Sequence, residues 1–125
     1  MSLLSIDPAD GQVVERWPVA GAAEVEAALE RSAAAFAGWS RASFEERAGV
    51  LRRASALLRA EAELHARLMA REMGKPLAQG RAEVEKCAWA CEHYAAVAAG
   101  ELADRPVATE GFASHVAFRP LGPVL

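Results

Sequence analysis

The chain has 125 residues, a formal net charge of −3 and 53% hydrophobic against 25% charged residues, which is typical of a globular domain with a modest core. Its 14 basic residues are spread among 17 acidic ones, which argues against a nucleic-acid-binding groove. No stretch approaches the roughly 20 apolar residues of a membrane helix, and residues 1–4 do not begin a signal peptide, so we predict a cytoplasmic protein without a membrane partner.

The N-terminal residues predict a β-hairpin. Two short β-prone runs flank Asp7-Pro8-Ala9-Asp10-Gly11, in which proline presets φ and glycine accepts a positive φ. The second run, residues 13–19, is predicted to end near Pro18 and Gly21.

Residues 22–100 predict a layer of about four helices. Thirty residues of the chain are alanine, which favours helices and a thin core. The first helix is expected from Ala22 to Trp39, and the second to start after Ser43, where Ser43-Phe44-Glu45-Glu46 has the form of a capping box. A third helix, or a bent continuation of the second, is expected to end at Gly74. The fourth carries a stripe of small residues from Val84 to Ala98, and Gly100 is expected as its C′ residue.

The last residues predict strands. Residues 112–119 alternate as in a half-exposed strand, and residues 121–125 begin an apolar run without a polar terminator. We expect this run to be a strand cut off as it starts.

Two short motifs invite a sharper interpretation. Cys87 and Cys91 lie four residues apart in the fourth helix, but they form no CxxC pair, and His93 is expected to point away from Cys91. We therefore predict small core cysteines, a surface histidine and no metal. Gly74-Lys75-Pro76 lacks the spacing of a phosphate-binding loop and is interpreted as helix punctuation.

Several stretches, in order along the chain, resemble the aldehyde dehydrogenase superfamily. The most specific is Arg71-Glu72-Met73-Gly74-Lys75-Pro76, followed by Ala82-Glu83-Val84, Tyr94-Ala95 and Arg119-Pro120-Leu121-Gly122-Pro123. Within that superfamily, these residues with Cys91-Glu92-His93-Tyr94-Ala95 are most similar to the bacterial succinate-semialdehyde dehydrogenases.

The resemblance implies an α/β fold in which this mostly helical chain is the N-terminal part of a Rossmann-like NAD(P)-binding domain. Its expected parts are a hairpin and strand over 1–20, a helical layer over 22–100, a strand that serves as an oligomerisation arm over 107–121, and the start of a further strand over 121–125. The whole enzyme would oxidise an aldehyde, succinic semialdehyde to succinate, with NAD or NADP, as a dimer or tetramer.

The same resemblance places the chemistry outside this segment. The family uses a cysteine nucleophile, an asparagine that stabilises the oxyanion and a glutamate that activates water, and none of them corresponds to a residue here. We therefore expect no catalytic, cofactor-binding or metal-binding residues, and an inactive chain by itself. Lys86 and Trp89 are expected to flank the substrate entrance, although a solvated lysine and a core tryptophan are the simpler interpretations.

Two alternatives to an enzyme segment remain open. The chain can be a helical module that binds a dehydrogenase subunit through the strand near Phe112 and the apolar end. It can also be a fragment without a function of its own.

Overall fold

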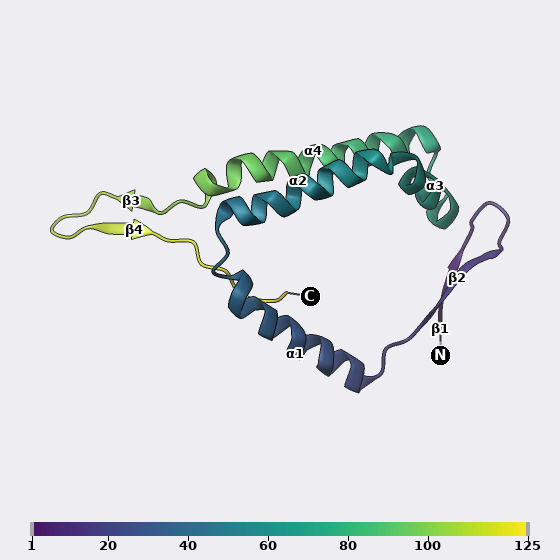
Figure 1. Ribbon diagram of the computed structural model, residues 1–125, viewed down its shortest axis with the longest axis horizontal. Coiled ribbons are helices and arrows are strands. Elements are labelled where there is room, and N and C mark those ends of the chain that lie inside the picture. The colour runs from purple at the N-terminus through teal and green to yellow at the C-terminus, as the bar shows by residue number, and fades with distance from the viewer. Residues whose placement is uncertain (1, 125) are drawn as a thin grey trace.

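The computed structural model describes residues 2–124 and consists of two hairpins joined to four helices (Figure 1). The elements in chain order are β1 (Ser2–Ile6), β2 (Val13–Pro18), α1 (Ala22–Trp39), α2 (Phe44–Ala60), α3 (Ala62–Met73), α4 (Leu77–Glu101), β3 (Arg105–Val107) and β4 (Ser114–Val116). The expectation of a mostly helical segment with an N-terminal hairpin is confirmed.

The first hairpin turns where the sequence predicts. β1 and β2 pair antiparallel, and Gly11 has a φ of 74°, in the left-handed region that glycine accepts without strain. The Asp7 carboxylate accepts a hydrogen bond from the Ala9 backbone N–H at 2.8 Å, and the Asp10 carboxylate accepts one from Gln12 at 2.9 Å. These aspartates satisfy backbone donors that the turn leaves free.

A capping box starts α2. The Ser43 hydroxyl accepts a hydrogen bond from the Glu46 backbone N–H at 3.2 Å, and the Glu46 carboxylate accepts one from the Ser43 backbone N–H at 2.7 Å. The hydrogen bonds with Ser43 lower the pKa of the Glu46 carboxyl below its usual value. The expected box is confirmed, and it fixes the chain direction after the turn that follows α1.

Replacing Ser43 by alanine is expected to destabilise the fold by about 1 kcal/mol. The first turn of α2 then loses the Ser43 hydroxyl, which accepts a hydrogen bond from the Glu46 backbone N–H. Thermal unfolding followed by circular dichroism measures the effect. Ser32→Ala, at an exposed position within α1, is the matched control. Equal melting temperatures for the two variants would contradict the role of the cap.

α2 and α3 are separate helices, and α3 ends against the hairpin. Gly74 follows α3 with a φ of 68°, and a Cβ placed there would lie 3.1 Å from Pro8 Cγ. The Ser5 hydroxyl donates to the Glu72 carboxylate at 2.9 Å. Gly74 thus ends the helix in a left-handed conformation and also allows the hairpin turn to approach closely.

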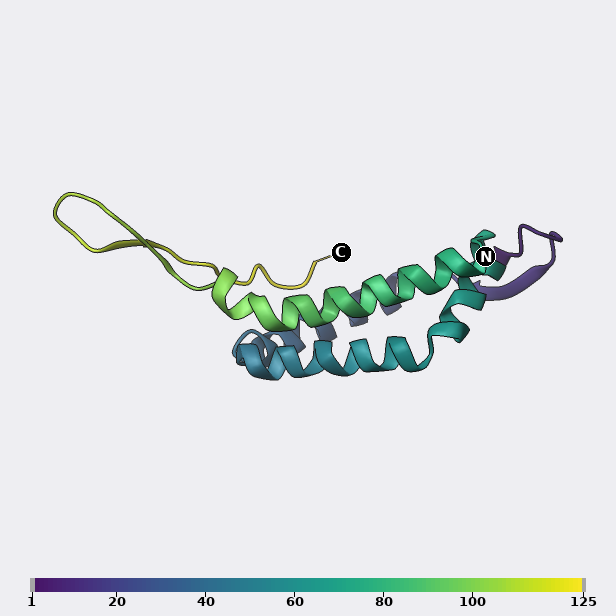
Figure 2. The same cartoon turned by 90° about the horizontal axis from the view of Figure 1, so that it is seen from above.

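α4 is the longest helix, and both α2 and α3 pack against it. Figures 1 and 2 show α2 and α4 running side by side, with α3 at the end where α4 begins. Gly80 is buried where α4 crosses α3, and a Cβ at this position would lie 3.1 Å from Ala66 Cα. The two backbones approach this closely only because both residues are small.

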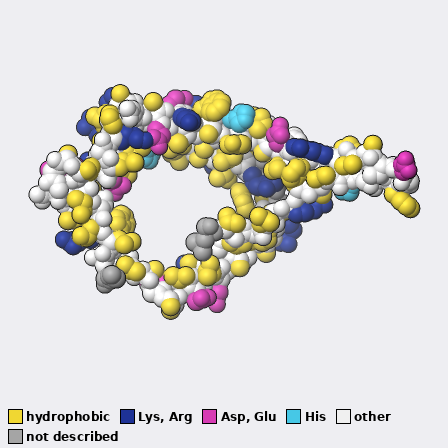
Figure 3. Space-filling model, turned by 180° about the vertical axis from the view of Figure 1, so that it is seen from behind, with side chains coloured by type: hydrophobic (Ala, Val, Ile, Leu, Met, Phe, Trp, Pro, Cys, Tyr) yellow, Lys and Arg dark blue, Asp and Glu magenta, His cyan; other side chains and the backbone are white. Residues whose placement is uncertain are grey.

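The core is as thin as the alanine content predicts. The buried hydrophobic residues are small, namely Ala48, Ala66, Val84 and Ala88. α1 has no buried residue and lies apart from the α2–α4 stack (Figure 1). The outline is an open ring, and Figure 3 shows hydrophobic side chains along its inner rim. Within residues 2–124, every helix is too short or too polar to cross a lipid bilayer.

Three details of the second half differ from the sequence predictions. α4 continues to Glu101, so Gly100 is a helical residue and not C′. Within residues 112–119 only Ser114–Val116 form a strand, β4, which pairs antiparallel with β3, a strand that the sequence did not predict. Residues 121–124 form no strand, because a strand needs a neighbour for its backbone hydrogen bonds and this segment has none among the described residues. Residue 125 lies outside the described range.

Candidate functional site

A cluster of charged and polar side chains joins α2 to α4. The Arg59 guanidinium donates to Glu85 at 2.9 and 3.0 Å and to Glu92, where one bond measures 3.0 Å. Ser55, only 1% exposed, donates to Glu92 at 3.1 Å and accepts from Arg59 at 3.2 Å. The hydrogen bond from Arg59 is the main cause that lowers the pKa of the Glu92 carboxyl below its usual value of 4.5. All polar groups of the cluster are partnered, so its geometry favours a structural role.

The cluster predicts an acid-sensitive contribution to stability. Because the folded-state pKa of Glu92 is lowered, its contribution is complete above the unfolded-state pKa and is lost as the pH falls through the folded-state value. The melting temperature is therefore expected to fall on acidification below about pH 4.5, and to fall less steeply in Glu92→Gln. Glu30→Gln, at an exposed position within α1, is a control outside the cluster. Identical pH profiles for the wild type and Glu92→Gln would refute the assignment.

Lys86 lies in a shallow, open depression on α4. The depression has a volume of about 580 Å³ and also includes Glu83 and Cys87. The Glu83 carboxylate forms an ion pair with Lys75, the residue that follows Gly74. Because Glu83 already pairs with Lys75, it does not neutralise Lys86, and Lys86 adds a positive charge to an accessible surface.

Trp89 lies outside that depression. Its ring stacks on His93, with centroids 5.4 Å apart, and His93 in turn meets Tyr94 edge to face at 5.3 Å. Trp89 is 57% exposed. The structure therefore places both predicted entrance residues on the surface of α4 but does not bring them into one pocket. Residues three apart lie on the same side of a helix, but their side chains can still reach different neighbours.

The cysteines differ from the prediction of two small core residues. Cys91 is half-buried, whereas Cys87 is exposed beside Lys86. The helix turns by about 100° per residue, so the four-residue spacing leaves these side chains at different depths against a thin stack. Within the part of the chain that the structure describes, no three histidine, cysteine, aspartate or glutamate residues form a group that could hold a metal ion.

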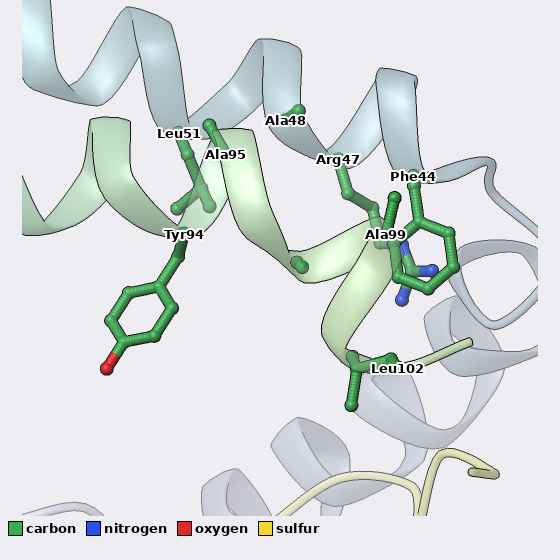
Figure 4. Close-up of a pocket in the computed structure, with 9 residues that line it drawn as sticks. Phe44, Arg47, Ala48, Leu51, Tyr94, Ala95, Ala99 and Leu102 are labelled. Atoms are coloured by element: carbon green, nitrogen blue, oxygen red, sulfur yellow. The ribbon is translucent and has the colours of Figure 1, made fainter. Parts of the chain in front are cut away.

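An apolar groove of about 170 Å³ separates the start of α2 from the end of α4. Figure 4 shows Phe44 and Arg47 side by side at its α2 end near Leu102, while Tyr94 points away from α2 into the open side of the molecule. The groove lining contains no nucleophile paired with a base. This geometry can pack an apolar segment but provides no chemistry.

Sequence reasoning missed the Arg59 cluster and the position of Arg47. Arg59 lies 26 and 33 residues from its two carboxylate partners, and no local pattern links residues so far apart. Phe44 and Arg47 are three apart on a helix, a spacing that predicts contact between them, but their location beside the end of α4 comes only from the tertiary structure.

Known proteins resemble this chain over almost its whole length. The succinate semialdehyde dehydrogenase [NAD(P)+] Sad of Escherichia coli K12 is 40% identical over 98% of this chain and 26% of its own length. A probable succinate-semialdehyde dehydrogenase [NADP(+)] of Synechocystis is 38% identical over all of this chain and 28% of its own.

Solved structures agree with these relatives. The structure of a succinic semialdehyde dehydrogenase from Streptococcus pyogenes, in complex with NADP+, covers 90% of this chain and 25% of its own, with a TM-score of 0.85 and 25% identity. The chain thus spans about a quarter of the length of the relatives it matches, and in the curated ones it matches the N-terminal part. The sequence model of the aldehyde dehydrogenase family matches residues 2–125, so the chain belongs to the aldehyde dehydrogenase family.

Proposed function

We propose that this chain is the N-terminal segment of an NAD(P)-dependent dehydrogenase that oxidises succinic semialdehyde to succinate. The observation that carries the proposal is the 40% identity over 98% of the chain with the Escherichia coli succinate semialdehyde dehydrogenase. By family resemblance, the segment contributes scaffold while cysteine, asparagine and glutamate residues elsewhere perform the chemistry. The alternative, a module that binds a dehydrogenase subunit, has no comparable support.

The test compares two aldehydes and two proteins. The longest form of the protein purified from its source is expected to reduce NAD or NADP with succinic semialdehyde, and to act more slowly on butanal, which has the same carbon chain without the carboxylate. The 125-residue chain alone is expected to reduce neither cofactor. Equal kcat/KM values for the two aldehydes would exclude a succinic semialdehyde site, and activity of the short chain would exclude a purely scaffolding role.

Lys86 is proposed to help attract the substrate carboxylate. It is exposed in an open depression, and the neighbouring Glu83 already pairs with Lys75. Lys86→Gln is expected to raise the KM for succinic semialdehyde by about two- to fivefold, with little change in kcat or in the KM for butanal, because one screened surface charge acts on the charged substrate alone. Arg53→Gln, exposed on α2, is the control. A parallel rise for both aldehydes would argue against electrostatic attraction.

The β3–β4 hairpin is proposed to pair with another subunit of a dimeric or tetrameric cytoplasmic enzyme. The hairpin projects away from the helices (Figures 1 and 2), and Phe112 near its tip is 88% exposed. Its sheet has two strands, so each strand has an outer edge free within the described residues. Light scattering of the enzyme is expected to give the mass of two or four subunits, and a monomeric mass would refute this assembly.

A further inference from the structure

A second cavity contains unpaired positive charge. It has a volume of about 560 Å³, within the range of small-molecule sites, and lies where the turn after α1, the end of α4 and residues 118–120 meet. Three charged residues line it, namely Arg47, Asp104 and Arg119. None of them belongs to the Lys86 depression or to the Arg59 cluster.

Arg47 is held in place but has no anionic partner among the described residues. Its guanidinium carbon lies 4.4 Å from the centroid of the Phe44 ring, a cation–π contact that fixes the orientation of the planar group. Its Nε is shielded from solvent without a hydrogen-bond acceptor, and no carboxylate among residues 2–124 forms an ion pair with its side chain. The cost of the shielded Nε is internal to the fold, whereas the other guanidinium nitrogens, which are not buried without a partner, are the donors that an anion in the cavity can meet.

Asp104, the one carboxylate among the described residues that line the cavity, pairs with residues other than Arg47. Asp104 lies 3.6 Å from His115 Nε2 and 3.9 Å from Arg119 Nη1. Arg119 also donates to the Phe118 carbonyl at 3.2 Å. The lining therefore contains two guanidinium groups and one carboxylate, and its charge at neutral pH is positive by one unit.

We propose that this cavity binds a carboxylate against Arg47, and that a small dicarboxylate also reaches Arg119. The guanidinium fork matches the planar geometry of a carboxylate and binds it through two parallel hydrogen bonds. The proposal is independent of the dehydrogenase function, since it depends only on Arg47, Phe44 and the charges around them. The carboxylate can come from a free small molecule or from an acidic side chain of covering polypeptide.

The test titrates the 125-residue chain with malonate at constant ionic strength and follows the backbone amide signals of Phe44 and Arg47 by NMR. Saturable shifts are expected, weaker with acetate. Arg47→Met, which keeps the apolar stem on Phe44, is expected to weaken binding roughly tenfold or more, because a charged pair of hydrogen bonds is lost. The affinity of Arg47→Lys for malonate should fall between those of the wild type and Arg47→Met, since lysine keeps the charge without the forked geometry of the guanidinium.

Arg53→Met, on the same helix outside the cavity, should bind malonate as the wild type does. Should Arg47→Met lose helix content, Arg119→Met provides the second test. This variant should weaken malonate binding less than Arg47→Met does and should leave acetate binding unchanged. Repeating the titration on the longest purified form separates the two sources: binding by both forms identifies a free ligand, and binding by the short chain alone identifies an acidic side chain. Shifts that do not saturate, or equal binding by Arg47→Met and Arg53→Met, would overturn the proposal.

Discussion

Replacing Gly80 by alanine is expected to destabilise the protein by about 1 kcal/mol, although alanine is the better helix former. A Cβ at Gly80 would lie 3.1 Å from Ala66 Cα, 3.2 Å from Ala66 Cβ and 3.3 Å from the Ala66 carbonyl oxygen. These atoms belong to the backbone of α3 and to the Cβ of Ala66, so the α3 backbone itself must move by a few tenths of an ångström to make room. Overpacking of this kind costs about 1–3 kcal/mol, more than the 0.5–1 kcal/mol gained in helix propensity.

Gly100→Ala is the matched control on the same helix. Among residues 2–124, apart from the neighbouring backbone of α4 itself, no atom lies within 4 Å of a Cβ at Gly100, so the propensity gain is unopposed and the melting temperature should rise. Opposite shifts for the two variants in thermal unfolding would support close packing of α4 on α3. An increase in stability for both would show that α3 does not approach Gly80 as described.

Replacing Ala88 by leucine is expected to destabilise the helical stack by about 1–3 kcal/mol. Ala88 is fully buried at 0% exposure in the middle of α4, and leucine adds three carbons to a site without room for them. For a domain of this size the melting temperature is expected to fall by several degrees.

Ala96→Leu tests whether the cost comes from burial. Ala96 lies on the same helix and is exposed, so a leucine there meets solvent and should change stability little. A similar loss in both variants would mean that leucine disturbs α4 itself and that Ala88 is not an interhelical contact.

Much of the local structure could be predicted because its signals lie within a few residues. Gly11 and Gly74 were predicted to end or turn the chain, and both adopt a positive φ. The Ser43–Glu46 capping box joins residues three apart, and the bounds predicted for α1 are those observed. The prediction that Gly100 ends α4 was wrong, because the helix continues to Glu101 and Gly100 keeps a negative φ.

The candidate site was less predictable. Lys86 and Trp89 were expected at the substrate entrance by resemblance, and that role stays a prediction. The spacing of Lys86 and Trp89 did not reveal that the Trp89 ring stacks on His93 and lies outside the depression that contains Lys86. The direction of a long side chain depends on its rotamer and neighbours as well as on its position along the helix.

The sequence by itself determined the first hairpin, the helical layer and the family, because turn glycines, caps, helical periodicity and ordered motifs are encoded by residues close together in the chain. Only the tertiary structure decided which helices meet, that Gly80 touches Ala66, that Arg59 joins two carboxylates of α4, and that Arg47 and Arg119 line one cavity. The named contacts join residues 14 to 33 positions apart, and the two arginines of the cavity are 72 positions apart. Their geometry follows from the packing of whole helices, which no local pattern specifies.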